Sequence, residues 1–419
     1  MGSGHPRGAG NAAGPPAART GTPGRPCPPQ AAEPHARSAR PSAKGASDDP
    51  AHPLLAGAFG VLLATAVATA APLAARPAPS TFLGPLHTLT RVASTVPGNG
   101  DLNPYGVAVV PRTMGRLHRG DVLVSNFNDH TNAQGTGTSI VAVSPSGGRT
   151  LFGQVDARAL PGSCPGGVGL TTALGVTTSG WVVVGSLPSR DGTAATARAG
   201  CLIVLDDRGH VRETLSGHGI NGPWDMTLAE HRSRVDLFVS NVLNGTVRAN
   251  GAVVHRGTVL RVTLRLRGAL PPERLSTTVV GSGVAERSDP AALVIGPTGV
   301  GLGPCDTLYV ADTLDNRLSA VADASDRTTS AGRGRTVSVG GALDAPLGLA
   351  LAPNGHLVTA NAGNGNLVET TPAGRQVAVR TVDSSGSPRG AGALFGLAIP
   401  SSLSAYLVDD ATNTLQRLH

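Results

Sequence analysis

Asparagine and aspartate side chains recur where short apolar phrases of the sequence end, and they offer the commonest chemistry in the chain. Amide and carboxylate oxygens are the ligands that a hard cation such as Ca²⁺ prefers. If the ends of these phrases meet in space, their oxygens could hold a cation or a polar ligand. The same residue types also cap turns by bonding to their own backbone, and recurrence at equivalent positions is what that structural role requires. The candidate ligand-binding residues of this kind are Asn126, Asn128, Asp129, Asn241 and Asn361, and the candidate metal ligands are Asp312, Asp409 and Asp410.

The segment "HGINGPWDM" is a second candidate, because it places His218, Trp224 and Asp225 close together in sequence. Five of six related phrases have Gly at the position of Asp225. Trp224 could form a ligand-binding wall, and His218 with Asp225 could form a general-base pair. The alternative is that Trp224 only packs between neighbouring sheets.

A long polar, glycine-rich segment from Asn126 to Ser139 lies between two apolar phrases and contains His130. Long loops on a rigid scaffold often carry binding residues. His130 is therefore the third catalytic candidate, beside His218 and Asp225. The segment could equally be a connection without a function.

One phrase recurs six times between residue 85 and the C-terminus: a turn, a bulky residue, usually a glycine, and an apolar alternation. The copies begin at Asn103, Thr172, Gly222, Gly296, Ala345 and Ala393. Each is followed by a second β-rich phrase, and most by a third. Alternation of this kind, bounded by Gly, Pro, Asn and Asp, predicts short strands. The spacing, for example 74 residues from Gly222 to Gly296 and 49 from Gly296 to Ala345, predicts an all-β, six-bladed β-propeller.

The end of the chain predicts how the ring closes. The last copy ends at His419 after only three strand phrases, whereas residues 84–97 ("GPLHTLTRVASTVP") precede the first copy and supply a spare strand. Because an unpaired edge strand is a liability, we expect this N-terminal strand to complete the last blade. The propeller is predicted to span residues 84–419.

The stretch from Pro297 to Val321 resembles an NHL repeat, in Pro297, Gly299, "LYVAD" at residues 308–312, Asn316 and Arg317-Leu318. The copy that begins at Pro346 matches less well, because Asn361 replaces the aspartate. The resemblance covers residues 85–419 and implies an NHL-repeat propeller of the exported bacterial type. More distantly the chain resembles gluconolactonase and strictosidine-synthase-like propellers. That likeness implies a calcium-dependent site at the mouth of the central channel.

The N-terminal part has a different character. Residues 1–52 are rich in Pro, Gly, Ala and Arg, and are predicted to be a disordered leader. Residues 53–76 contain an uncharged apolar run ending in "ATAAP", which predicts a signal peptide or an uncleaved membrane-anchor helix. We therefore expect a secreted or periplasmic protein. Cys164 and Cys201 could pair in such an oxidising compartment, and Cys305 lies in a strand phrase.

The charge pattern argues against nucleic acid as a partner. Residues 1–76 contribute +4 of the formal net charge of +7, and aromatic residues make up 3% of the chain. A nucleic-acid surface would concentrate arginines on one face and interleave aromatic side chains for stacking.

Three functions remain open for what we expect to be a monomer. The first is a binding or interaction scaffold for an unknown protein or small-molecule ligand. The second is a calcium-dependent hydrolase or lyase with its site at the channel mouth. The third is a quinone-linked electron-transfer propeller, for which the sequence has no haem motif.

Overall fold

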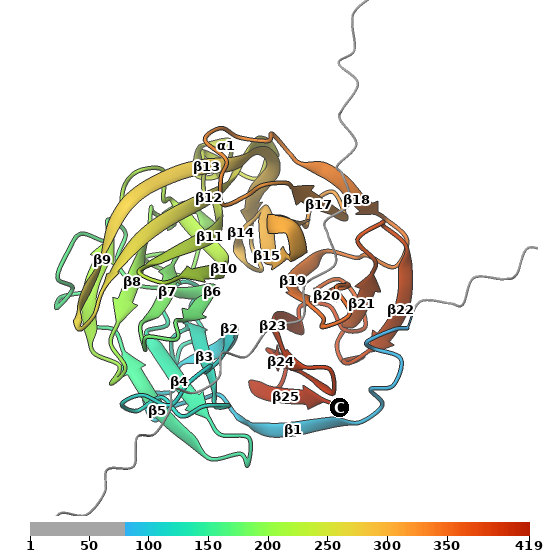
Figure 1. Cartoon of the computed structure of the whole chain (residues 1–419), viewed down its shortest axis with the longest axis horizontal. Helices are drawn as coiled ribbons and strands as arrows, with labels where there is room; N and C mark the ends of the chain where they lie inside the picture. Colours follow the sequence, from blue (N-terminus) through green and yellow to red (C-terminus); the bar gives the residue numbers. More distant parts are fainter. Residues whose placement is uncertain (1–79) are drawn as a thin grey trace, which may run out of the picture. The chain divides into compact units, whose positions relative to one another are not determined.

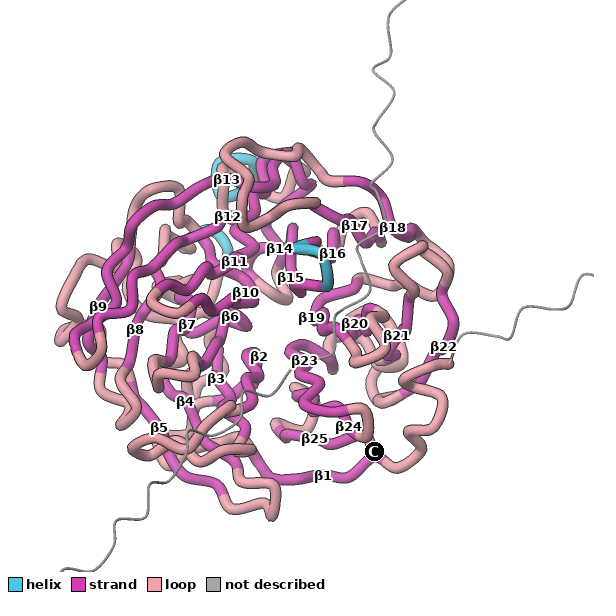
Figure 2. Tube along the Cα trace, in the orientation of Figure 1, coloured by secondary structure: helices cyan, strands magenta, loops and turns pink. Residues whose placement is uncertain are grey.

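The computed structural model describes residues 80–419, and these form a six-bladed β-propeller (Figure 1). The predicted leader (1–52) and hydrophobic segment (53–76) lie outside the described residues. Among the described residues no helix has the length and apolar character needed to cross a membrane. Strands dominate the trace in Figure 2, and the helical segments are α1 (Thr246–Ala249), η1 (Ala194–Thr196) and η2 (Pro304–Asp306).

Each blade is one antiparallel sheet whose first strand lies nearest the axis (Figure 1). Blade 1 contains β2 (Leu102–Val109), β3 (Val122–Asn128), β4 (Ser139–Val143) and β5 (Arg149–Gln154). Blade 2 contains β6 (Leu170–Val176), β7 (Val182–Ser186), β8 (Cys201–Leu205) and β9 (Val211–Leu215). Blade 3 contains β10 (Gly222–His231), β11 (Arg234–Val242), β12 (Val254–Arg267), β13 (Leu270–Asp289) and β14 (Leu293–Ile295).

The second half of the chain repeats the arrangement. Blade 4 contains β15 (Pro297–Gly303), β16 (Thr307–Asp312), β17 (Arg317–Val321) and β18 (Arg335–Val339). Blade 5 contains β19 (Pro346–Leu351), β20 (Leu357–Asn361), β21 (Asn366–Thr370) and β22 (Gln376–Thr381). Blade 6 contains β23 (Leu394–Ser401), β24 (Ser404–Asp409), β25 (Thr414–Leu418) and β1 (Leu89–Ser94).

The N-terminal strand closes the ring, which confirms the prediction for residues 84–97. β1 pairs antiparallel with β25, in the register Leu89 opposite Leu418. Just outside the strands, Thr88 and His419 exchange two backbone hydrogen bonds of 2.8 Å. The first strand of the described chain therefore completes a blade whose other strands are the last three.

Blades bury each other, as the apolar strand phrases predicted. Every residue of β3, β4, β7 and β8 is buried. Apolar clusters lie between neighbouring blades, for example one that joins Phe152 of blade 1 to Ile203 of blade 2. A sheet that is apolar on both faces needs a neighbour on each side, so closing the ring stabilises every blade.

Blade 3 departs most from the sequence pattern. Its β12 and β13 form a long ribbon, yellow in Figure 1, of which the sequence phrase "VLRVTLR" marks only part. β13 reaches blade 2, where Arg274 Nη1 donates a 2.9 Å hydrogen bond to the Ser216 carbonyl. Cys305 also differs from expectation, since it lies in η2 between β15 and β16 rather than in a strand.

Ring closure predicts a large effect of one backbone change. Thr88→Pro removes the N–H that donates to the His419 carbonyl, and should lower the free energy of unfolding by about 1–3 kcal/mol. Thr88→Ala keeps the N–H, and should stay within about 0.5 kcal/mol of the parent. Urea unfolding measures both variants. Equal stability of the proline and alanine variants would contradict closure through this strand.

Candidate functional site

The asparagine side chains at the strand ends form hydrogen bonds with nearby backbone groups. Asn241 Oδ1 accepts from the N–H groups of Asn221 and Gly222 at 2.8 and 3.1 Å. Asn241 Nδ2 donates to the Gly219 carbonyl and to Thr258 Oγ1. Asn241 therefore fastens the segment before β10 to β11 and β12.

Asn126 and Asn361 act in the same way in blades 1 and 5. Asn126 Nδ2 donates to the Thr95 carbonyl and to Ser139 Oγ at 3.1 Å. Asn361 Nδ2 donates to the Ala342 carbonyl at 2.7 Å. Within residues 80–419 the buried Oδ1 atoms of both residues have no hydrogen-bond partner. The Nδ2 atoms of both residues therefore hold nearby backbone groups, and their Oδ1 atoms are left as unpaired acceptors in this part of the chain.

The loop after β3 is organised by its own polar side chains. Asn128 Nδ2 donates to Asn132 Oδ1 at 2.7 Å. Asp129 Oδ1 accepts from the N–H and hydroxyl of Thr131 and from the N–H of Ala133. Burial raises the pKa of Asp129, but these hydrogen bonds outweigh burial and leave the pKa below its ordinary value. His130 is exposed.

The three candidate metal ligands do not form one site. Asp312 Oδ2 accepts from Arg317 Nε at 3.2 Å and from Arg333 Nη2 at 2.9 Å. Asp409 accepts from the Thr412 N–H and from Gln416 Nε2. Burial, followed by the charge of Asp409, raises the pKa of Asp410 to about 7.

These three aspartates do not make a calcium site by themselves. Asp312 binds two arginines through one carboxylate oxygen, and Asp409 uses both of its oxygens for backbone and amide donors. Calcium also accepts amide and backbone oxygens as ligands, so calcium binding stays a prediction. In the described part of the chain, no group of three or more His, Cys, Asp or Glu residues is placed to hold a metal ion.

The structure separates His218 from Asp225 and does not bring them into a general-base pair. His218 is exposed in the turn from Gly217 to Ile220, with a positive φ of 52°. Asp225 is buried within β10, with 9% of its surface exposed. Sequence proximity was misleading here, because Gly217 and Gly219 also have positive φ and make a tight turn before the strand begins.

Trp224 belongs to an aromatic plug, which we define as Tyr105, Phe127, Trp224 and Phe395. Tyr105 stacks on Phe395 with ring centroids 4.1 Å apart and on Phe127 at 4.5 Å. Trp224 is tilted against Tyr105 at 5.8 Å. Tyr105 comes from blade 1 and Trp224 from blade 3, which are not adjacent. Their contact therefore lies in the central channel, where the innermost strands of all blades converge. Trp224 is thus a packing residue that helps to fill the channel.

Beyond the plug lies an axial cavity of about 210 Å³. All six innermost strands line it, through Val107, Leu174, Asp225, Val300, Leu349 and Leu397. Its walls become more exposed toward the C-terminal ends of the strands, where Leu302, Leu351 and Ile399 are half-buried. The lining is apolar apart from Asp225, two threonines and backbone groups.

Asp225 is the sole acidic residue among those that line this cavity. Its Oδ2 accepts the N–H of Val300, in the innermost strand of the next blade, at 3.1 Å. Its own N–H donates to Ser240 Oγ at 3.0 Å. Burial raises the pKa of Asp225 to about 7, even though the N–H groups of Met226 and Val300 favour the ionised form. A carboxyl group in this state can donate or accept a proton near neutral pH.

Thr172 is a second polar group of the axial cavity, and it was not among the sequence candidates. Its buried hydroxyl has no hydrogen-bond partner within residues 80–419. Buried polar atoms are normally paired, so an unpaired hydroxyl at a cavity is free to bind a ligand or water. The sequence carries no signal for Thr172, because the cavity exists only after six distant strands converge.

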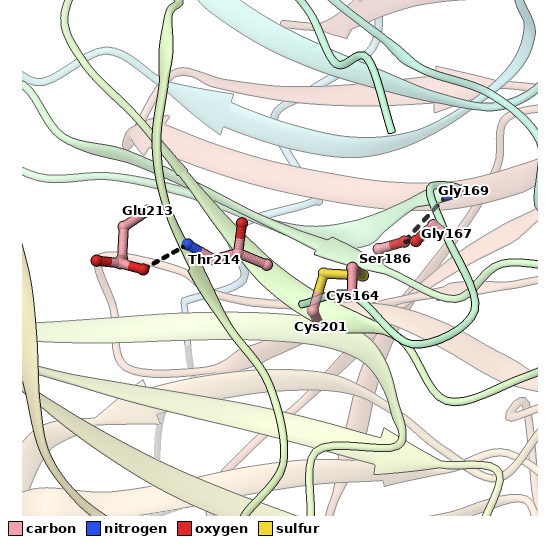
Figure 3. Close-up of a disulfide and its surroundings, with 7 residues drawn as sticks. All are labelled: Cys164, Gly167, Gly169, Ser186, Cys201, Glu213 and Thr214. Carbon is pink, nitrogen blue, oxygen red and sulfur yellow. Dashed lines mark hydrogen bonds between the residues drawn. A yellow bond between two sulfur atoms is a disulfide. The ribbon is translucent and has the colours of Figure 1, made fainter. Parts of the chain in front are cut away.

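Blade 2 carries a disulfide between Cys164 and Cys201, so the pairing that the sequence left open is present (Figure 3). It ties the connection between β5 and β6 to the first residue of β8. Beside it, Ser186 Oγ accepts the N–H of Gly169 and donates to the Gly167 carbonyl, as Figure 3 also shows.

Comparisons with known proteins find likenesses in structure alone. No protein-family model matches the chain. No curated protein sequence matches it either. A gluconolactonase from Xanthomonas campestris is 13% identical, with a TM-score of 0.49 over 80% of this chain and 90% of that one. The calcium-binding protein regucalcin from Agrobacterium tumefaciens is 16% identical, with a TM-score of 0.48 over 78% and 93%. A virginiamycin B lyase from Staphylococcus aureus is 12% identical, with a TM-score of 0.45 over 79% and 98%.

The raised pKa of Asp225 predicts a pH-dependent gain in stability from Asp225→Asn. The unfolded chain loses this proton near 3.8 and the folded chain near 7, so the parent loses stability as pH rises between these values. The variant can still accept from Val300 and avoids this loss. Its advantage should grow from near zero at pH 4 to about 1–4 kcal/mol at pH 8.

Urea unfolding at several pH values measures this advantage. Exposed Asp326→Asn is the control for loss of one negative charge. Parallel stability curves for the parent and Asp225→Asn would show that Asp225 ionises normally in the fold.

Proposed function

We propose that this chain is an exported binding propeller that holds a small molecule in its axial cavity. The ligand has a compact apolar body and one cationic amine, which pairs with Asp225. The observation that carries the proposal is a single buried carboxyl group in a cavity whose other lining side chains are aliphatic apart from two threonines.

The chemistry of the cavity supports this class of ligand. Small-molecule sites are concave and mostly apolar, with a few placed polar groups that orient the ligand. Here Leu174, Val300 and Leu349 supply the apolar walls, and Asp225 and Thr172 supply the polar groups. A bound ammonium group would stabilise the ionised form of Asp225, which burial alone disfavours.

Ligand binding should therefore release a proton near neutral pH. At pH 6 an Asp225 with a pKa of about 7 is mostly protonated in the free protein. Pairing with an ammonium ion ionises it, and the proton passes to the buffer. At pH 8.5 Asp225 is already ionised, so binding should release almost none.

The disulfide supports the exported part of the proposal. Structural disulfides form and persist mainly in oxidising compartments, and Cys164–Cys201 joins two segments of blade 2. Secretion, a membrane anchor and a monomeric state stay predictions of the sequence. So do NHL membership, calcium binding and hydrolase or lyase activity.

Calorimetric titration with cyclohexylammonium tests the proposed function. Cyclohexanol, similar in size and uncharged, is the ligand control. The charged probe should bind more tightly to the parent, and Asp225→Asn should weaken it by about 10-fold or more. Titrations in two buffers of different ionisation enthalpy should show proton release at pH 6 and almost none at pH 8.5.

Three results would overturn the proposal. One is the absence of binding by cyclohexylammonium. Another is equal affinity for cyclohexanol. The third is unchanged affinity in Asp225→Asn.

A further inference from the structure

A second hollow, of about 390 Å³, lies where blades 2 and 3 meet. We name it the arginine pocket, because Arg198, Arg248 and Arg256 line it. Arg198 comes from the connection between β7 and β8, Arg248 from α1, and Arg256 from β12. It shares no lining residue with the axial cavity.

The three guanidinium groups are available for a ligand. All three arginines are exposed, and none forms an ion pair or a side-chain hydrogen bond with another described residue. None of the residues that line the pocket is acidic. The nearby carboxyl group is that of Glu286, which is fully buried. Burial raises the pKa of Glu286 to about 7, although hydrogen bonds from Asn244 and Leu243 and the charge of Arg256 lower it. The open side of the pocket is therefore positive and has no competing anion on its walls.

Side-chain hydrogen bonds hold the floor of the pocket in place. Glu286 Oε1 accepts the N–H of Asn244 at 2.9 Å, and Asn221 Nδ2 donates to Asn244 Oδ1 at 2.8 Å. Leu243 has a φ of 67°, a conformation that an ordinary side chain adopts only when its surroundings impose it. The floor of Leu243, Asn244 and Gly245 is thus fixed before any ligand binds.

Two of the arginines sit on fixed supports. A Cβ built on Gly245 would lie 3.3 Å from Arg256 Nη1, so the guanidinium packs directly over the floor. The backbone at Arg198 is tied on both sides, since Arg198 N donates to Pro188 O and Gly166 N donates to Ala199 O. Gly166 lies two residues after Cys164, so the disulfide holds the segment that supports Arg198.

We propose that the arginine pocket binds a dianionic oxyanion, the phosphate group of a small organic monoester. Guanidinium forks match the oxygens of such groups and form charge-assisted hydrogen bonds with them. Three arginine side chains should attract a headgroup with two negative charges more strongly than a headgroup with one. The pocket exceeds the size of a bare anion, and Ala197, Leu243 and Val247 offer an apolar wall for the organic part.

Calorimetric titration of the full chain with phenyl phosphate, at constant ionic strength and at pH 8 where its phosphate group is a dianion, tests the proposal. Phenyl sulfate is the matched control, because its headgroup is also tetrahedral but carries a single negative charge. Benzoate serves as a planar monoanion. Phenyl sulfate and benzoate should each bind at least about 5-fold more weakly than phenyl phosphate.

Arg198→Gln, Arg248→Gln and Arg256→Gln should each weaken binding by about 5- to 10-fold. The matched control is Arg112→Gln, since Arg112 is exposed in the connection between β2 and β3 and its side chain makes no contact with another described polar group. Circular dichroism and the melting temperature show that each variant is folded.

The proposal fails if phenyl phosphate does not bind, if phenyl sulfate or benzoate binds as tightly, or if Arg112→Gln weakens binding as much as the pocket variants do. The ester titration tests the arginine pocket separately from the axial cavity, because the two share no lining residue. Asp225→Asn should therefore leave ester affinity unchanged.

Discussion

The structure depends on how closely six innermost strands approach one another around the axis. In blades 4, 5 and 6 the backbone of the neighbouring blade fills the space at this glycine: a Cβ on Gly299, Gly348 or Gly396 would overlap a backbone carbonyl oxygen of the next innermost strand. Gly396 makes this contact with Tyr105 of blade 1, so the same contact that joins neighbours also closes the ring. Glycine fits here because it has no side chain to separate the strands.

Blade 3 breaks this rule, and the candidate site follows from the break. Asp225 occupies the position at which the other blades have glycine. Its carboxyl group accepts a hydrogen bond from the Val300 N–H, in the neighbouring blade. The residue that keeps two blades together is therefore also the acidic group of the axial cavity. Tyr105, Trp224 and Phe395 of the aromatic plug immediately precede the cavity-lining parts of their innermost strands. The cavity walls are more exposed toward the C-terminal ends of these strands, so we expect a ligand to enter there.

The sequence predicted the architecture because propeller blades are local and repetitive. The six phrases correspond to β2, β6, β10, β15, β19 and β23, and the spare strand before Asn103 is β1. Asp225 could be selected because it departs from a repeated glycine. The axial cavity, and with it the role of Thr172, could not be predicted, because the cavity combines strands far apart in sequence. The arginine pocket could not be predicted either, because it forms where a connection of blade 2 meets α1 and β12 of blade 3. His218 and Asp225 are close in sequence, but they do not form a pair, because a tight turn at residues 217–220 leaves His218 exposed while Asp225 is buried.

Burial raises the pKa of Asp225 to about 7, so we expect this carboxyl group to titrate near neutral pH within the axial cavity. Carboxyl ¹³C chemical shifts of aspartate-labelled protein, followed against pH, test it directly, and Asp225→Asn identifies the resonance. We expect a titration midpoint of about 7. A midpoint close to the ordinary value of 3.8 would show that water reaches Asp225 freely, and would contradict the proposal that burial in the axial cavity raises its pKa.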